Sequence, residues 1–203
     1  IRLRPQEQHY ISMISALAVA DYIKSKGIDA KIKWPNDIYV GDRTICGMLI
    51  ENILGSDTLS ASIIGIGLNL NQLEFDQSLK NPTSLLREVM NILPNNTSLK
   101  EFDRHSALEE LLSYFFDLYT LINIDGGKEM FAKRFESRLY RKDEWHNYEE
   151  INDLSNLNRP VETICGNRIK ARIIGIDDQY NLVLEHECGE TKHYAFKEIK
   201  YVW

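Results

Sequence analysis

Lys33 stands at the end of a short strand-like segment and directly before a rigid turn. In an extended chain, Ile32 and Trp34 share one face of that segment, and Lys33 points to the opposite face. Pro35 ends the strand, because it cannot donate a ladder hydrogen bond and it restricts the residue before it. A lysine fixed at such a point can hold a carboxylate or a phosphate by its charge. A solvated lysine at a strand edge explains the same position.

Glycine residues recur inside two stretches of strand-like sequence. Gly47 shares a face with Leu49 on the first stretch, and Gly65, Gly67 and Asn69 share a face on the second. Glycine weakens a strand interior, so a bulge, a bend or the close approach of another group is expected there. Two bare patches would let a flat ligand lie against backbone, and Asn69 offers the donor and acceptor that suit a purine edge. Packing or local twist accounts for these glycines equally well.

Familiar nucleotide-binding and hydrolase motifs are missing from the sequence. The Gly65-Ile66-Gly67 run lies inside a strand-like stretch, lacks a third glycine and does not open a helix, so it is not a dinucleotide fingerprint. No Gly-Lys-Ser/Thr phosphate loop, nucleophile elbow or HExxH motif occurs either.

The cysteines and histidines do not predict a metal site. Cys46, Cys165 and Cys188 are odd in number and far apart, which fits neither a disulfide framework nor a CxxC pair. His186 and His193 lie near Cys188, but in sequence that alternates like a half-buried strand. We therefore expect no metal bound by protein ligands.

Composition sets broad limits on function. The chain of 203 residues is 43% hydrophobic and 27% charged, with a formal net charge of −6. These values are ordinary for a globular protein, and the acidic balance argues against a nucleic-acid binder. No apolar run has membrane-spanning length and no charged-then-apolar leader is visible, so we expect no membrane association and a cytoplasmic location.

Periodicity and turn residues predict an α+β domain followed by a small β domain, with the boundary near residue 157. The expected helices cover residues 12–26, 102–122 and 128–141, with a capping box from Ser98 to Glu101 before the second. The expected strands cover residues 30–34, 38–40, 44–54 and 59–68, and the last looks buried on both faces. Residues 69–82 read as a long loop. Closely spaced strands beyond residue 157 suggest a barrel or sandwich.

These separate signals together resemble the biotin protein ligases. The family's order and approximate spacing are matched by Lys33-Trp34-Pro35-Asn36-Asp37, Cys46-Gly47-Met48-Leu49-Ile50-Glu51 and Gly65-Ile66-Gly67-Leu68-Asn69. The first run is highly specific to the family, whereas the other two are weak alone. Pro82-Thr83-Ser84-Leu85 and Asn158-Arg159-Pro160-Val161 also look like the family. The resemblance covers nearly the whole chain from about residue 10.

The resemblance implies roles for particular residues. Lys33 matches the family's catalytic lysine, which contacts biotin and the phosphate of the adenylate. The implied biotin-binding residues are Lys33, Gly47, Met48, Leu49, Gly65 and Gly67. The implied ATP-binding residues are Lys33, Asn36, Asn69 and Arg43. Arg43 is included because Arg43-Thr44 stands where the family usually has a lysine. Trp34, Asn36 and Asp37 are expected to support the turn first.

The resemblance also implies fold, reaction and partners. It predicts a mixed β-sheet with helices, the biotin/lipoate ligase-like catalytic core, over residues 1–157, and a small SH3-like β-barrel over residues 158–203. The implied enzyme is an ATP-dependent, AMP-forming ligase that converts biotin to biotinyl-AMP with Mg²⁺ on the phosphates. It then transfers biotin to a lysine of the biotin carboxyl carrier protein. The family's Gly/Arg-rich adenylate loop is expected upstream of Ile1.

Two other functions stay open. A lipoate or octanoate ligase or transferase shares the fold and a catalytic lysine but lacks the Trp-Pro-Asn-Asp run. A non-enzymatic biotin-responsive regulator is the second, because some family members carry an N-terminal DNA-binding domain that represses biotin genes. No such domain is visible in this sequence. The sequence leaves the acceptor protein and the oligomeric state open, a homodimer included.

Overall fold

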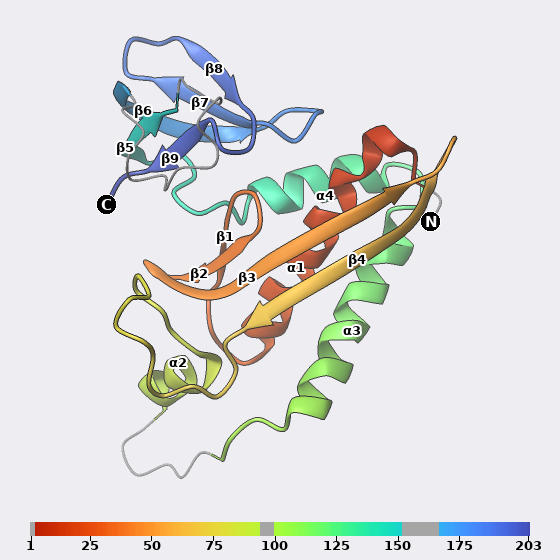
Figure 1. The fold of residues 1–203 in the computed structure, drawn as a ribbon, viewed down its shortest axis with the longest axis vertical. Helices are drawn as coiled ribbons and strands as arrows, with labels where there is room; N and C mark the ends of the chain where they lie inside the picture. The colour runs from red at the N-terminus through yellow and green to blue at the C-terminus, as the bar shows by residue number, and fades with distance from the viewer. Residues whose placement is uncertain (1–2, 94–99, 152–166) are drawn as a thin grey trace. The chain divides into compact units, whose positions relative to one another are not determined.

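The computed structural model describes residues 3–93, 100–151 and 167–203. The chain divides into two compact units, Ile1–Tyr140 and Arg141–Trp203 (Figure 1). The first unit combines helices with a sheet and the second is built from strands, which confirms the predicted α+β class. The boundary expected near residue 157 lies in 152–166, outside the described residues.

A four-stranded sheet forms the frame of the first unit. Its strands are β1 (Lys31–Lys33), β2 (Asp37–Val40), β3 (Arg43–Leu54) and β4 (Leu59–Leu68), hydrogen-bonded in that order. All three ladders are antiparallel, and the four predicted strands are confirmed within one or two residues at each end. Isolated parallel bridges from Ile32 to Leu139 and from Thr44 to Pro82 give the sheet its mixed character.

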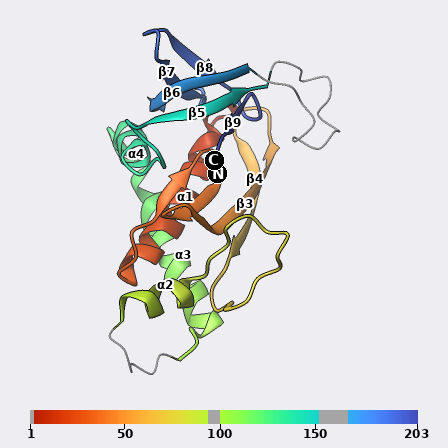
Figure 2. The same ribbon diagram turned by 90° about the vertical axis from the view of Figure 1, so that its left-hand side faces the viewer.

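One buried helix, α1, covers a single face of this sheet. After a short 3₁₀ turn at Pro5–Glu7, α1 runs over His9–Ser25, and Gly27 follows it with a left-handed φ of 83°. Helix α1 contacts β1, β2 and β3 on one side, and α3 (Arg104–Leu121) and α4 (Gly127–Glu136) on the other. In Figure 2 it lies between the long strands and α4. The remaining helix is α2 (Leu85–Ile92).

The ends of the predicted helices differ from the structure by one to five residues. Helix α3 begins at Arg104, because the Asp103 side chain accepts a hydrogen bond from the Ser106 amide. The capping box expected from Ser98 begins outside the described residues. Helix α4 ends at Glu136 and not near 141, because the chain beyond it pairs with β1. The Ile32 amide donates to the Arg138 carbonyl, and the Ile32 carbonyl accepts from the Tyr140 amide. A long-range pairing therefore replaced the last helical turn.

The prediction that residues 59–68 are buried on both faces is wrong. Exposure alternates along β4, and the side chain of Ile63 is 58% exposed. The apolar run looked like a central strand, but among the described residues β4 is the last strand in the order and its ladder runs only to β3. One face of the β3–β4 pair is consequently open to solvent.

The second unit is a five-stranded antiparallel sheet. The strands are β5 (Trp145–Glu150), β6 (Asn167–Ile176), β7 (Leu182–His186), β8 (Thr191–Tyr194) and β9 (Ile199–Tyr201), in the order β8-β7-β6-β5-β9. Strands β8 and β9 are the two ends of that order, so the described strands make an open sheet with the expected SH3-like strand content. Among its described residues the buried side chains are apolar or tyrosine apart from His186, which hydrogen-bonds to Tyr194 at 2.8 Å. Tyr194 in turn donates to Glu150, which lowers the pKa of that carboxyl.

No helix in the described parts of the chain is long and apolar enough to cross a membrane.

Glu7 ties the start of the chain to α4. Its buried carboxylate accepts hydrogen bonds from Arg4 and forms an ion pair with Lys128. The hydrogen bond from Arg4 is the main cause that lowers the pKa of Glu7 to about 2, and Lys128 adds to it. A carboxylate with a depressed pKa stabilises the fold above its unfolded pKa and loses that effect as pH falls toward the folded value.

We expect Glu7→Gln to remove roughly 2 kcal/mol of unfolding free energy near neutral pH and less as the pH falls from about 4.5 to 2. The variant and wild-type curves of stability against pH should therefore converge at the acidic end. Urea unfolding at several pH values measures this, with Glu109→Gln on α3 as the matched control. A pH-independent difference would show that Glu7 acts by packing alone.

Two described cysteines should differ sharply in reactivity. Cys46 is 1% exposed within β3, and burial, helped by the charge of Asp37, raises the pKa of its thiol to about 12. Cys188 is exposed. Only the thiolate reacts with alkylating agents, so at pH 8 native protein should take up iodoacetamide at Cys188 at least about a hundredfold faster than at Cys46. Peptide mapping by mass spectrometry distinguishes the sites. Equal rates before unfolding would contradict the buried position of Cys46.

Candidate functional site

Four residues face each other in one row across the sheet. Lys33 on β1 lies opposite Asp37 on β2, Asp37 lies opposite Gly47 on β3, and Gly47 lies opposite Gly67 on β4. Directly opposed residues in antiparallel strands project to the same face. The row therefore places one cation, one carboxylate and two residues without side chains next to each other. We call it the Lys33–Gly67 row.

Lys33 is held at its end of the row by two neighbours. Its ammonium lies 3.1 Å from a carboxylate oxygen of Asp37 and 5.2 Å from the centre of the Tyr39 ring. Only 20% of the Lys33 side chain is exposed. The predicted alternation is confirmed, because Ile32 and Trp34 are buried on the other face. The lysine is thus a positioned charge, with more support than a solvated edge lysine would have.

The turn that follows Lys33 is fastened to β3. The Trp34–Pro35 peptide bond is cis, and Asn36 is linked to Met48 twice. The Asn36 side-chain amide donates to the Met48 carbonyl, and the Met48 amide donates to the Asn36 carbonyl at 3.0 Å. The Asn36 side-chain amide therefore supports the turn, as the sequence predicted. Its predicted contact with ATP is a further role that this geometry leaves as a prediction.

Packing does not account for two of the three glycines. A methyl group on Gly47 would lie 3.5 Å from Asp37, and one on Gly65 would lie 3.5 Å from the Leu49 carbonyl. Both are ordinary van der Waals distances, and neither residue has a left-handed φ. At Gly67 the added carbon would lie 3.3 Å from the Gly47 carbonyl, which is tighter. The protein itself thus leaves room at Gly47 and Gly65, and this favours an external group over that face.

Leu49 continues this open face, whereas Met48 does not. Leu49 lies opposite Gly65 and its side chain is 66% exposed. Met48 is 4% exposed and belongs to the opposite, buried face. Of the predicted biotin-binding residues, the sheet therefore brings Lys33, Gly47, Leu49, Gly65 and Gly67 to one face. Met48 can reach a ligand there only through its backbone.

Asn69 is tied to the segment before α2, and Arg43 is tied to α2 itself. The Asn69 side-chain amide donates to the Thr83 carbonyl at 3.0 Å, and its backbone amide donates to Ile45 at 2.9 Å. Arg43 forms a 2.8 Å ion pair with Glu88, a glutamate of α2 that is 5% exposed and also accepts from Thr83. Asn69 follows Gly67 by two residues at the end of β4. Arg43 compensates a buried charge, which sequence reasoning did not foresee.

The structure adds Asp37 and Tyr39 as neighbours of the predicted lysine. Both were readable in principle, because residues on either side of a tight turn become cross-strand partners. Glu88 had no such signal, since it lies 45 positions beyond Arg43 in the sequence.

No group of three metal-ligating side chains occurs among the described residues. His186 is hydrogen-bonded to Tyr194, and His193 pairs with Asp177 at 2.8 Å.

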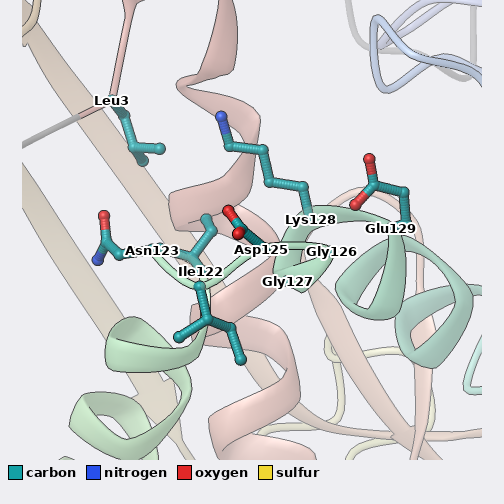
Figure 3. A pocket seen from close by; sticks show the side chains of 9 residues that line it. Leu3, Ile122, Asn123, Asp125, Gly126, Gly127, Lys128 and Glu129 are labelled. Carbon is teal, nitrogen blue, oxygen red and sulfur yellow. The ribbon is translucent and has the colours of Figure 1, made fainter.

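A cavity of about 340 Å³ lies elsewhere in the first unit, around the connection between α3 and α4 (Figure 3). Its lining includes Leu3, Asn123 and Asp125 and none of the predicted site residues. The Lys128 side chain, which Figure 3 shows extending from the start of α4, is the one paired with Glu7.

Comparison with known proteins agrees with this geometry. Residues 3–69 match the model of the Biotin/lipoate A/B protein ligase family. The chain is 33% identical over 122 residues to Biotin--protein ligase 1, chloroplastic, of Arabidopsis thaliana, which covers 58% of the chain and 31% of that relative. It is 28% identical over 200 residues to Bifunctional ligase/repressor BirA of Bacillus subtilis, covering 95% of the chain and 54% of that relative. The chain thus spans about a third to a half of these relatives.

Solved structures show the same fold. The biotin protein ligase from Aquifex aeolicus in complex with biotin and ATP has a TM-score of 0.68 and 21% identity, covering 100% of this chain and 74% of that one. The ligase from Leishmania major in complex with biotinyl-5-AMP has a TM-score of 0.53 and 18% identity, covering 95% and 73%. The match to the biotin/lipoate A/B protein ligase family model spans the strands that carry the Lys33–Gly67 row, and the chain is similar to members of that family over this part.

Proposed function

We propose that this chain carries the catalytic core of a biotin protein ligase, which activates biotin with ATP and transfers it to a lysine of a biotin carboxyl carrier protein. The observation that carries the proposal is the Lys33–Gly67 row. It joins a positioned cation to a glycine floor on the open face of the sheet. Relatives that match 58% and 92% of the chain are named as biotin–protein ligases, which supports the same conclusion.

In the first step two anions must meet. An oxygen of the biotin carboxylate bonds to the α-phosphorus of ATP, the bond from that phosphorus to the β-phosphate bridge breaks, and pyrophosphate leaves with the electron pair. A fixed cation offsets the repulsion between the reactants and the charge that develops at phosphorus. Lys33 has this role in the proposal. Asp37 keeps the ammonium at the row and lies 3.1 Å from it.

The second step transfers the acyl group to the partner. The amine of the acceptor lysine attacks the acyl carbon of biotinyl-AMP, the acyl–oxygen bond to AMP breaks, and the amine loses a proton. The intermediate has to be shielded from water until the carrier arrives. The described open face supplies the floor for it. The acceptor and the cytoplasmic location remain parts of the proposal, to be tested by labelling of lysates and by fractionation.

The glycines and the residues beside them suggest where each substrate lies on the open face. Biotin lies over Gly47, Leu49 and Gly65 with its carboxylate toward Lys33. The nucleotide extends toward Asn69, whose side-chain carbonyl can accept from an adenine amino group while its amide stays on Thr83. Asn36 and Arg43 complete the proposed ATP contacts. For Arg43 this requires a role beyond its ion pair with Glu88.

Mg²⁺ is not given a protein site in this proposal. Near the row the described residues offer the Asp37 carboxylate, which is already paired with Lys33, and no cluster of three metal-ligating side chains. Mg²⁺ is commonly held by one or two carboxylates together with substrate phosphates and waters. These residues do not fit an independent metal centre, so we derive no step through the ion.

A lipoate or octanoate ligase is the second candidate, because the matching family model includes lipoate ligases. Release of pyrophosphate by the full-length protein with ATP and either biotin, lipoate or octanoate separates the two. We expect release with biotin. Release with lipoate alone would reverse the assignment, and binding of biotin without any release would favour a regulator.

We expect Lys33→Ala to slow biotinyl-AMP formation by about a hundredfold or more, the usual scale for losing one preorganised charge stabiliser. The fold should survive, because the apolar partners Ile32 and Trp34 lie on the opposite face. Pyrophosphate release without carrier protein isolates this step. Lys31→Ala, two residues earlier on the same strand face, is the matched control. Lys33→Arg should restore only part of the rate, since a planar fork replaces a compact charge.

A folded Lys33→Ala protein that releases pyrophosphate at the wild-type rate would remove Lys33 from the chemistry.

We expect Gly47→Val to weaken biotin binding by about tenfold or more while unfolding free energy changes by less than about 1 kcal/mol. The first added carbon has ordinary contact distances, so the side chain projects into the ligand's space without disrupting the sheet. Calorimetric titration beside thermal melting tests both halves. Thr191→Val, an exposed strand position on β8 in the second unit, is the control. Unchanged biotin affinity in a less stable variant would show that the glycine serves packing.

A further inference from the structure

Tyr140 joins three parts of the first unit that surround Lys33. Its backbone amide donates to the Ile32 carbonyl on β1 at 2.8 Å, one residue before the lysine. The centre of its ring lies 5.1 Å from that of Tyr39 on β2, and its hydroxyl donates to Asp42, in the turn after β2, at 2.5 Å. Tyr140 comes from the chain beyond α4, so a distant segment of the sequence reaches the strands around the lysine.

The tyrosine pair lies on the same side of the sheet as the lysine. Tyr39 follows Asp37 by two residues on β2, and Asp37 lies opposite Lys33, so all three project to one face. That face is open at the glycines, yet Tyr39 and Tyr140 are each only 6% exposed. A single ring on an open strand face has several rotamers available, and contact with a second ring restricts that choice.

A lysine needs such support because its side chain is flexible. A four-carbon stem links the ammonium to the backbone, so the charge of an unrestrained side chain spreads over many rotamers. Asp37 holds the ammonium at 3.1 Å, but an ion pair also offsets the charge that an anionic substrate needs. The Tyr39 ring, with its centre 5.2 Å from the ammonium, attracts the cation by its quadrupole and adds no net charge.

The two lysines of β1 differ in a way that fits this support. Lys31 lies directly opposite Tyr39 in the ladder and shares the face of Lys33. The Lys31 side chain is 41% exposed and its ammonium lies 3.6 Å from Asp29, whereas the Lys33 side chain is 20% exposed. A place on this face of β1 therefore does not by itself shield a lysine, and the diagonal contact with the Tyr39 ring contributes to the shielding of Lys33.

We propose that Tyr140 is a positioning residue for Lys33, acting through the ring of Tyr39. The bonds of Tyr140 to Ile32 and Asp42 fix where its own ring lies, that ring fixes Tyr39, and Tyr39 fixes the ammonium. The position of the ammonium is a property of the folded chain. The consequence for the reaction rate rests on the proposed function.

The position of the ammonium is tested by NMR of the full-length protein with isotope-labelled lysine. Protons held over an aromatic ring resonate upfield of their ordinary position, so the ε-methylene group of Lys33 should show this shift. Its signal is identified by its loss in Lys33→Arg. Tyr39→Phe keeps a ring and should keep the shift, whereas Tyr39→Leu should abolish it. Tyr140→Leu should reduce the shift, and Tyr119→Leu on α3 is the matched control.

The consequence for the rate is tested by pyrophosphate release with biotin and ATP, in a double-mutant cycle with Lys33→Ala. Tyr39→Leu should lower kcat about threefold or more with KM little changed, which is the scale of a lost contact between a cation and a ring. Because Tyr39 acts through the lysine, the same substitution in the Lys33→Ala protein should have no further effect. Tyr140→Phe, which loses only the bond to Asp42, should lower kcat less than Tyr140→Leu.

Two results would overturn the inference. One is an upfield shift of Lys33 that is unchanged in folded Tyr140→Leu protein. The other is an equal loss of rate from Tyr39→Leu with and without Lys33, because the tyrosine would then act on the fold or on the substrate. If wild type releases no pyrophosphate with biotin, the proposed function has failed, and the NMR comparison still decides where the ammonium is held.

Discussion

The position of the whole site depends on one buried row of side chains. Ile32, Ile38 and Cys46 lie opposite each other on β1, β2 and β3, and each is at most 1% exposed. The Lys33–Gly67 row is the next row along, on the other face. Because side chains alternate along a strand, a slip of one residue would exchange the two rows. Burying the apolar row against α1 therefore fixes the register that brings Lys33, Asp37 and the glycines together.

Coverage by α1 also explains why the opposite face is available. The helix contacts β1, β2 and β3 and buries one side of the sheet, so the first unit gains its core without using the other side. Stability and the proposed chemistry thus occupy different faces of the same strands. Side chains on the open face can be changed at little cost to packing. Glycines persist there although they weaken a strand, and the space left at Gly47 and Gly65 shows that internal packing does not demand them.

The strands and the site lysine could be predicted because they depend on local pattern. Alternation and turn residues located β1 to β4 and placed Lys33 at the end of a strand, directly before the turn at Pro35. Other features depend on contacts between distant segments. The end of α4 is set by the pairing of Leu139 with β1. The exposure of β4 depends on which strands α1 covers, and an apolar run reads the same whether one face or two are buried.

Arg43 and Asn69 show that a residue predicted from a motif to bind a ligand can also have a structural role. Both are predicted to meet the nucleotide, but Asn69 is engaged by the segment before α2 and Arg43 by α2 itself. Arg43 neutralises the buried Glu88, and Asn69 holds Thr83. Removing either side chain would leave a buried polar group without its partner, which lowers stability whatever its role toward ATP. A loss of activity at these two positions is therefore ambiguous. A loss of activity at Lys33 or Gly47 on the open face is not ambiguous in this way, because these residues can change without exposing the core.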